Sequence, residues 1–238
     1  MSSTTRPKPT KFTFYTSPQS PFAQRVDMAF KEVGLEFDEV FRVNTSDKPS
    51  WFVKEINPEG KIPVISIEGK NIAESLVLIE LAHDLKPEEG LLPTNPVKRA
   101  QIRFAIEYFG VKFIEAWAPY MGAFVDPSAR PKYFDYLEGI YERFNELLLE
   151  QAPSGPYFLG SEYSLADIAI APFISRNIAI NKGLLDGYEP EAIKKNPRLQ
   201  EFLNGITSRP SFKETYVGDE PVIAHVAKIL GINKETNA

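Results

Sequence analysis

Two hydrophobic periods alternate along the first third of the chain, and they predict strands interleaved with a helix. Residues 11–15, 37–43 and 62–67 have the composition and alternation of strands. Between the first two strands, apolar side chains recur every three or four positions, as on one face of a helix. They are Phe22, Val26, Ala29, Phe30 and Val33. Ser20 as N-cap and Pro21 at the first helical position suit the start of this helix, and Gly34 suits its end.

A hairpin turn at 68–70 and a helical pattern over 74–85 follow the third strand. The order of strands and helices predicts an α/β layer with a mixed sheet. The segment Pro87–Pro96 holds three prolines in ten residues and indicates a linker.

Beyond residue 96 the pattern is helical only. We expect helices over 97–121, 130–151, 164–182, 196–208 and 223–230. The chain therefore divides into a flexible tail (1–10), an α/β domain (11–86), a linker (87–96) and an all-helical domain (97–238). At about 150 residues per domain, a chain of 238 residues accommodates this division.

Composition and charge narrow the classes of function. The net charge of −5 argues against a nucleic-acid partner, which would need a basic face. No apolar run reaches the roughly 18 residues of a membrane span, and the N-terminus has no apolar signal segment, so we expect a cytoplasmic protein with no membrane partner. Without cysteine, the chain has no disulfide, thiolate zinc site or cysteine nucleophile. The two histidines, His83 and His225, argue against a histidine metal site, so we expect no metal.

Three short motifs in the α/β domain have both a structural and a functional interpretation. Ser20 is a helix N-cap, and its hydroxyl at the positive end of the helix dipole also suits a bound anion. The Ile62–Pro63 bond is trans on composition alone, since only about 5–6% of X–Pro bonds are cis. Glu74 and Ser75 either cap the next helix or hold the charged ends of an amino acid.

Two motifs lie in the helical domain. Ser164 and Asp167 form a capping box with Asp in place of Glu, for which we expect a structural role. An aromatic stripe at helical spacing indicates core, and Pro119 and Gly122 should distort its end so that the last two residues line a cleft. The stripe comprises Phe109, Phe113, Trp117, Tyr120 and Phe124.

Taken together, these features resemble the cytosolic glutathione transferases, over nearly the whole chain from Phe12 to about Gly231. The loop Tyr15–Arg25 is similar to the omega class, fungal type, which carries Cys-Pro-Phe-Ala where this chain has Ser20-Pro21-Phe22-Ala23. The ordered set of motifs makes the resemblance specific. They are Lys48-Pro49-Ser50-Trp51-Phe52, Asn57-Pro58, Ile62-Pro63-Val64 and Glu74-Ser75.

The resemblance implies a thioredoxin-like N-terminal domain that binds glutathione and an all-α C-terminal domain with the hydrophobic-substrate site. Pro63 would be a cis-proline, and Ile62 would pair its backbone with that of glutathione. Glu74 and Ser75 would hold the γ-glutamyl group, and Lys48 the glycyl carboxylate. The remaining assignments are Phe22 beside the sulfur, and Tyr120, Phe124 and Arg176 at the hydrophobic site. A solvated helix arginine is the alternative for Arg176.

Ser20 replaces the omega-class cysteine, so we expect thiol-transferase and dehydroascorbate reductase activities to be lost or very weak. A serine can instead stabilise the glutathione thiolate, with Tyr15 and Ser17 as reserve hydroxyls. Three hypotheses follow: a glutathione transferase acting on hydrophobic electrophiles, a carrier of aromatic small molecules that also binds glutathione, and an interaction domain. The interaction domain is disfavoured because the chain retains the residues that would bind glutathione, Lys48, Glu74 and Ser75. The resemblance also implies a homodimer.

Overall fold

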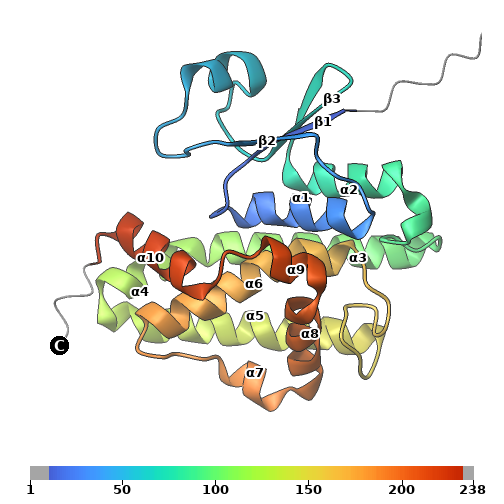
Figure 1. The fold of residues 1–238 in the computed structure, drawn as a ribbon. Coiled ribbons are helices and arrows are strands. Elements are labelled where there is room, and N and C mark those ends of the chain that lie inside the picture. Colours follow the sequence, from blue (N-terminus) through green and yellow to red (C-terminus); the bar gives the residue numbers. More distant parts are fainter. Residues whose placement is uncertain (1–10, 233–238) are drawn as a thin grey trace, which may run out of the picture.

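The computed structural model describes residues 11–232, apart from the side chains of Ile114 and residues 117–119. The predicted tail at 1–10 lies outside the described residues. Figure 1 shows two parts, a sheet with its helices above a bundle of helices. The sheet contains β1 (Phe12–Thr16), β2 (Glu39–Arg42), β3 (Val64–Ile67) and β4 (Lys70–Ala73) in the order β2-β1-β3-β4. β1 pairs with β2 in parallel, whereas β3 is antiparallel to both of its neighbours, so the predicted mixed sheet is confirmed.

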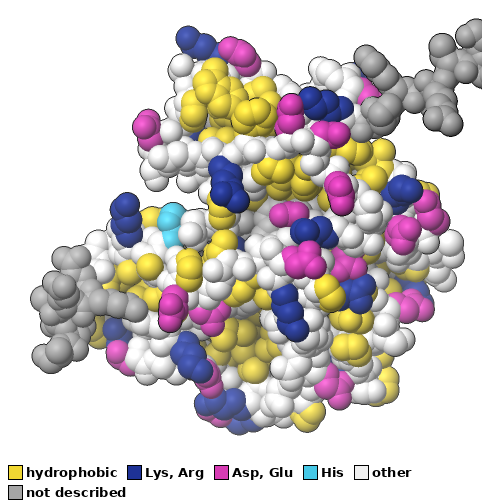
Figure 2. Space-filling view, in the orientation of Figure 1, with side chains coloured by type: hydrophobic (Ala, Val, Ile, Leu, Met, Phe, Trp, Pro, Cys, Tyr) yellow, Lys and Arg dark blue, Asp and Glu magenta, His cyan; other side chains and the backbone are white. Residues whose placement is uncertain are grey.

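Two helices lie between this sheet and the bundle (Figure 1): α1 (Pro21–Glu32) and α2 (Ser75–Leu85). Ser20 caps α1 as predicted, since its Oγ accepts a hydrogen bond from the Ala23 N–H at 3.2 Å. Of the predicted apolar face, Val26, Ala29, Phe30 and Val33 are buried in the core, whereas Phe22 at its start is exposed. Between β2 and β3 the chain forms a short π-helix, η1 (Phe52–Ile56), which the sequence pattern does not predict. The exposed side chains of Val40, Phe41 and Trp51 lie on β2 and beside η1, where Figure 2 shows hydrophobic atoms gathered on the surface.

The second part is helical throughout. Its elements are η2 (Pro87–Glu89), α3 (Pro96–Glu115), α4 (Trp117–Val125), η3 (Pro127–Ala129), α5 (Arg130–Gln151), α6 (Leu165–Leu184), α7 (Glu191–Lys195), α8 (Pro197–Ser208), α9 (Pro210–Thr215) and α10 (Asp219–Leu230). The helices predicted over 130–151, 164–182 and 196–208 are confirmed, and α10 begins four residues earlier than expected. The short helices α7 and α9 were not predicted.

The single helix expected over 97–121 is wrong, because the chain forms α3 and α4 with a break at Ala116. Proline has no N–H with which to bond the carbonyl four residues earlier. Four residues before Pro119 is Glu115, the last residue of α3. The predicted distortion therefore occurs before the proline, and the helix continues through Gly122.

The capping box at the start of α6 is confirmed. Ser164 Oγ accepts from the Ala166 N–H at 3.3 Å, and Asp167 Oδ2 accepts from the Ser164 N–H at 2.7 Å. Most of α6 is buried, so it forms the centre of the bundle and also contacts α1. Within residues 11–232, no helix is both long and apolar enough to cross a membrane.

Candidate functional site

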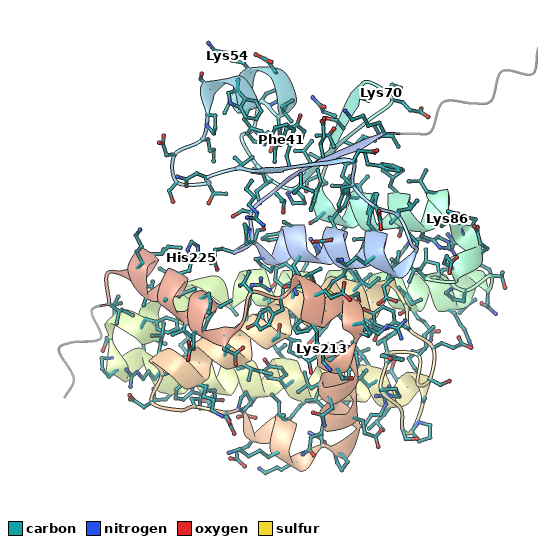
Figure 3. All side chains as sticks on the ribbon, in the orientation of Figure 1. Phe41, Lys54, Lys70, Lys86, Lys213 and His225 are labelled. Carbon is teal, nitrogen blue, oxygen red and sulfur yellow. The ribbon has the colours of Figure 1, made fainter. Side chains whose placement is uncertain are left out.

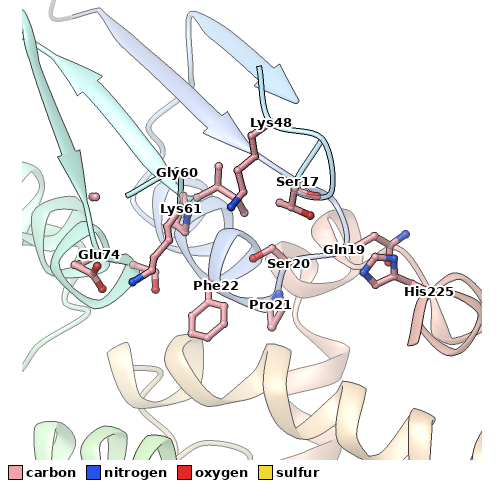
Figure 4. A pocket seen from close by; sticks show the side chains of 15 residues that line it. Ser17, Gln19, Ser20, Pro21, Phe22, Lys48, Gly60, Lys61, Glu74 and His225 are labelled. Atoms are coloured by element: carbon pink, nitrogen blue, oxygen red, sulfur yellow. The ribbon is translucent and has the colours of Figure 1, made fainter. Parts of the chain in front are cut away.

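A cavity of about 580 Å³ opens where the N-termini of α1 and α2 meet the loop before β3, and α10 reaches it from the bundle (Figure 4). All seven residues that the resemblance assigned to the thiolate and to glutathione binding line it together. They are Ser20, Phe22, Lys48, Ile62, Pro63, Glu74 and Ser75. The volume lies in the range of roughly 300–1,000 Å³ that is usual for sites of small molecules.

Ser20 and Phe22 form the α1 side of the cavity. The Ser20 N–H donates to the Ser17 carbonyl at 3.0 Å, and Ser20 Oγ accepts the Ala23 N–H. Because the oxygen acts as acceptor in the cap, the hydroxyl hydrogen can be donated to a molecule in the cavity. The positive end of the α1 dipole favours negative charge at this point. The Phe22 ring is 47% exposed and packs edge-on against Phe173 of α6.

The Ile62–Pro63 peptide bond is cis. The expectation from composition is therefore wrong, whereas the isomer implied by the resemblance is confirmed. Glu74 has a positive φ of 68°, and its side chain makes no capping hydrogen bond to α2. The structural interpretation of Glu74 and Ser75 as a capping pair is thus wrong as well, because the Glu74 side chain accepts no hydrogen bond from the start of α2.

The Ser75 hydroxyl is held from behind by Arg25, a residue that sequence reasoning missed. Arg25 Nε and Nη2 donate to Ser75 Oγ at 2.9 and 2.5 Å. The guanidinium lies 5.3 and 5.2 Å from the ring centres of Phe22 and Phe173. Burial lowers the pKa of Arg25 to about 10, although the charge of Glu74 raises it. The sequence did hold a signal for Arg25: it is a charged residue three positions after Phe22, on the apolar face of the predicted helix.

Lys48 and Lys61 bring positive charge to the same cavity. Gly60, with a φ of +64°, makes room for Lys48, because a Cβ there would lie 3.2 Å from Lys48 Cδ. Lys61 pairs with Glu59 at 2.9 Å, and both side chains are largely exposed. Sequence reasoning did not single out Lys61. Two cations at the rim suit a ligand that carries a carboxylate.

The remaining lining residues include Ser17, Gln19, Thr45 and His225. Figure 4 shows His225 beside Gln19, on the other side of Ser20 from Glu74. No local signal in the sequence could reveal that α10 brings a histidine to the cavity. Tyr15, the first reserve hydroxyl, is buried against Phe41 and is not among the lining residues, whereas Ser17 is.

The three residues assigned to a hydrophobic site lie away from the cavity lining. Tyr120 is buried and packs against Phe124 and Tyr133, with ring centres 4.6 and 5.5 Å apart. This agrees with the core interpretation of the aromatic stripe. Burial raises the pKa of Tyr120 above its ordinary value.

Arg176 is 5% exposed, so the solvated interpretation is wrong. It donates to Gln24 Oε1 and to the Pro172 carbonyl, and its guanidinium lies 5.2 Å from the Tyr216 ring centre. Burial lowers the pKa of Arg176 to about 10. Its place at a hydrophobic site stays a prediction, as do those of Tyr120 and Phe124.

The part of the chain that the structure describes contains no group of three or more metal-ligating side chains suited to a metal ion. What the cavity offers is hydroxyl groups, cationic side chains, a carboxylate and two helix N-termini. This set can bind a small zwitterionic molecule with several charged ends, with one aromatic ring, Phe22, beside it.

Comparison with known proteins gives matches along most of the chain. Residues 19–85 match the model of the glutathione S-transferase N-terminal domain, and residues 101–215 match that of the C-terminal domain. The chain is 30% identical over 223 residues to a probable maleylacetoacetate isomerase of Caenorhabditis elegans, covering 90% of this chain and 95% of that protein.

Two solved structures from Trametes versicolor are similar. Glutathione transferase Omega 1C superposes with a TM-score of 0.78 at 32% identity, covering 94% of this chain and 98% of the other. Glutathione transferase Omega 2S in complex with 2,4-dihydroxybenzophenone gives a TM-score of 0.70 at 29% identity, covering 93% of this chain and all of the other (100%).

Proposed function

The chain belongs to the glutathione S-transferase family, and we propose that it conjugates glutathione to hydrophobic electrophiles, with Ser20 stabilising the thiolate. The observation that carries this proposal is the position of Ser20 at the N-terminus of α1, in one cavity with Lys48, Glu74 and Ser75. The similarity to fungal omega enzymes supports assignment to an omega-like class in which serine replaces the usual cysteine.

Glutathione would lie along the cavity with its γ-glutamyl end at the start of α2. Glu74 would bind the ammonium group and Ser75 the carboxylate. Because Ser75 Oγ accepts two bonds from Arg25, its own hydrogen is available to that carboxylate. The Ile62 backbone would pair with the peptide, and Lys48 would bind the glycyl carboxylate. Each charged group of glutathione thus has a polar or oppositely charged partner in the cavity.

The sulfur would then lie between Ser20 and Phe22. A thiol with a pKa near 8.5 is only a few per cent ionised at pH 7, and lowering that pKa to about 6.5 requires about 2.7 kcal/mol. A hydrogen bond to a charged group contributes roughly 1.5–3 kcal/mol. The dipole of α1 adds roughly 0.3–1 kcal/mol. Together these contributions of about 1.8–4 kcal/mol span the required value, on the condition that Ser20 Oγ points at the sulfur.

The decisive measurement is the ultraviolet absorbance of the bound glutathione thiolate against pH, for the unmodified protein and for Ser20→Ala. We expect a pKa of about 6–7 that rises towards the free value of about 8.5 in the variant. A low pKa that survives the substitution would transfer the role to another hydroxyl, with Ser17 the nearer candidate because it lines the cavity. Glutathione that binds without any shift would refute the catalytic proposal.

A second function, the carriage of aromatic small molecules, has one specific observation in its favour. The similar Omega 2S structure holds 2,4-dihydroxybenzophenone. In this protein the exposed ring of Phe22 offers a stacking surface beside the glutathione region. Calorimetric titration with that benzophenone, with and without glutathione, tests this function, and binding without any conjugating activity would favour it.

We also propose a homodimer, as the family resemblance implies. Light scattering should give twice the chain mass of 26.8 kDa, and a mass equal to one chain would exclude the dimer. The hydrophobic second substrate, the roles of Tyr120, Phe124 and Arg176 in binding it, the domain boundaries and the cytoplasmic location belong to the same set of proposals.

A further inference from the structure

Among the described residues that line the cavity, His225 is the one that comes from the helical part of the chain. All the other lining residues lie between Ser17 and Ser75, in the part that contains the sheet. Figure 3 shows the imidazole on α10, close to the loop that enters α1, and Figure 4 shows it beside Gln19 and Pro21. Ser20 lies between this end and the Glu74 end. The γ-glutamyl group of glutathione would occupy the Glu74 end of the cavity. His225 therefore lies at the opposite end, which glutathione would leave unoccupied.

The position of His225 is set by the packing of α10 on α6. Gly183 of α6 lies under Ile223 of α10, and a Cβ at Gly183 would come within 2.6 Å of Ile223 Cδ1. Residues two apart on a helix point about 200° apart around its axis, at 3.6 residues per turn. The face that presents Ile223 to α6 therefore turns His225 away from α6. Val222 and Ala227 of α10 are also buried, which further anchors the helix.

The end of the cavity at His225 carries both polar and apolar groups, and Ser17 and Gln19 lie on this side of Ser20 (Figure 4). Pro21 contributes apolar surface at this end, and Phe22, which is 47% exposed, extends that surface towards Glu74 (Figure 4). Gln19 Oε1 is shielded from solvent and has no hydrogen-bond partner in the described part of the chain. An imidazole N–H at this position can donate to an oxygen acceptor of a molecule whose apolar part lies against Pro21 and Phe22.

Building on the proposed function, we propose that His225 is a catalytic residue for conjugated carbonyl substrates, donating a hydrogen bond to the carbonyl oxygen during addition of the glutathione thiolate. The sulfur forms a bond to the β-carbon, and the π-electron pair of the carbon–carbon double bond moves so that the oxygen becomes an enolate. Water then supplies a proton to the α-carbon, and no group leaves. Ser20 stabilises the charge on sulfur before the attack, and His225 stabilises the charge on oxygen after it.

Two electrophilic substrates distinguish a catalytic role of His225 from a structural one. An α,β-unsaturated ketone develops charge on oxygen when the thiolate adds, whereas a benzyl halide develops it on the departing halide. We would measure kcat/KM with both for the unmodified protein, His225→Phe and His225→Gln. The ratio of ketone to halide activity should fall about 100-fold in His225→Phe, the usual loss for one such donor. His225→Gln should recover part of that ratio because its amide retains an N–H.

The outcomes are distinct. A ratio that stays constant in His225→Phe, with both activities falling together or neither falling, overturns the role of His225 and leaves the proposed function standing. No recovery in His225→Gln relative to His225→Phe also counts against hydrogen-bond donation. If the unmodified protein binds glutathione in a calorimetric titration but turns over neither acceptor, the proposed function itself is refuted, and the role of His225 with it.

Discussion

Replacement of Asp167 by alanine should destabilise the protein without weakening its binding of glutathione. The carboxylate is fully buried at the start of α6 and lies outside the cavity lining. Its Oδ1 accepts from the Phe158 N–H at 2.7 Å, and its Oδ2 accepts from the N–H and Oγ–H of Ser164 at 2.7 and 2.9 Å. Asp167 thereby joins the loop before α6 to the first turn of that helix.

The magnitude follows from the two backbone groups that lose their acceptor. Each buried N–H left without a partner costs about 1–3 kcal/mol, so Asp167→Ala should cost about 2–6 kcal/mol. For a chain of this size each kcal/mol shifts Tm by roughly 2–4 °C, so a central value of about 4 kcal/mol lowers Tm by roughly 8–16 °C. Asp126 provides a matched control, because its exposed side chain caps η3 by accepting the Ser128 N–H at 2.9 Å. Asp126→Ala should cost only about 1 kcal/mol.

The effect should also depend on pH. Burial raises the pKa of Asp167 from 3.8 to about 7, and the hydrogen bonds from Phe158 and Ser164 oppose this rise. The folded protein therefore binds the proton more tightly than the unfolded chain. Protonation of Asp167 therefore stabilises the folded state. This stabilisation is fully present below the unfolded pKa of about 4 and is lost as the pH rises through the folded pKa of about 7. Asp167→Ala and Asp167→Asn should both abolish that slope.

Chemical denaturation at pH 4, 5.5 and 7.5, together with thermal melts and a glutathione titration at each pH, tests all three points. Unchanged stability of Asp167→Ala relative to the unmodified protein would refute the hydrogen-bond argument. A preserved pH slope in Asp167→Asn would refute the assignment of the titration. Weaker glutathione binding with unchanged stability would show that the capping box acts on the site.

Three further predictions concern the site and its supports. Gly183→Ala should destabilise the protein by about 1–3 kcal/mol in chemical denaturation, because the added methyl group meets Ile223 of α10. Gly139→Ala is the control: nothing lies within 4 Å of its added methyl group, so it should be neutral or stabilising. Equal effects of the two substitutions would contradict the close contact at Gly183. Arg25→Met should raise the Kd for glutathione roughly 10-fold or more, because Ser75 Oγ loses charged donors worth about 1.5–3 kcal/mol. An unchanged Kd in calorimetry would show that Arg25 does not support glutathione binding. Ser20→Cys should produce reduction of glutathionylated substrates that the unmodified chain lacks, because a helix N-terminus lowers a thiol pKa; strong reduction already present in the unmodified chain would contradict the proposal.

Local features of the site region could be predicted from the sequence because they depend on neighbours along the chain. The period of apolar residues located α1 and the strands, Ser20 and Pro21 marked a helix start, and the capping box marked the start of α6. The same reasoning failed where a distant group outweighed the local one. Ser75 has the composition of a cap, but Arg25 from another helix takes its oxygen instead.

Only the tertiary structure revealed Arg25 and His225 as parts of the site region. Arg25 reaches Ser75 across 50 positions of sequence, and His225 of α10 comes to lie beside Gln19. A hydrophobic period shows which face of a helix is buried but not which element covers it. The sequence by itself therefore determined the family resemblance, the strands, most helices and the hydroxyl at the start of α1. The buried arginine behind Ser75 and the histidine at the far end of the cavity depended on how those helices pack.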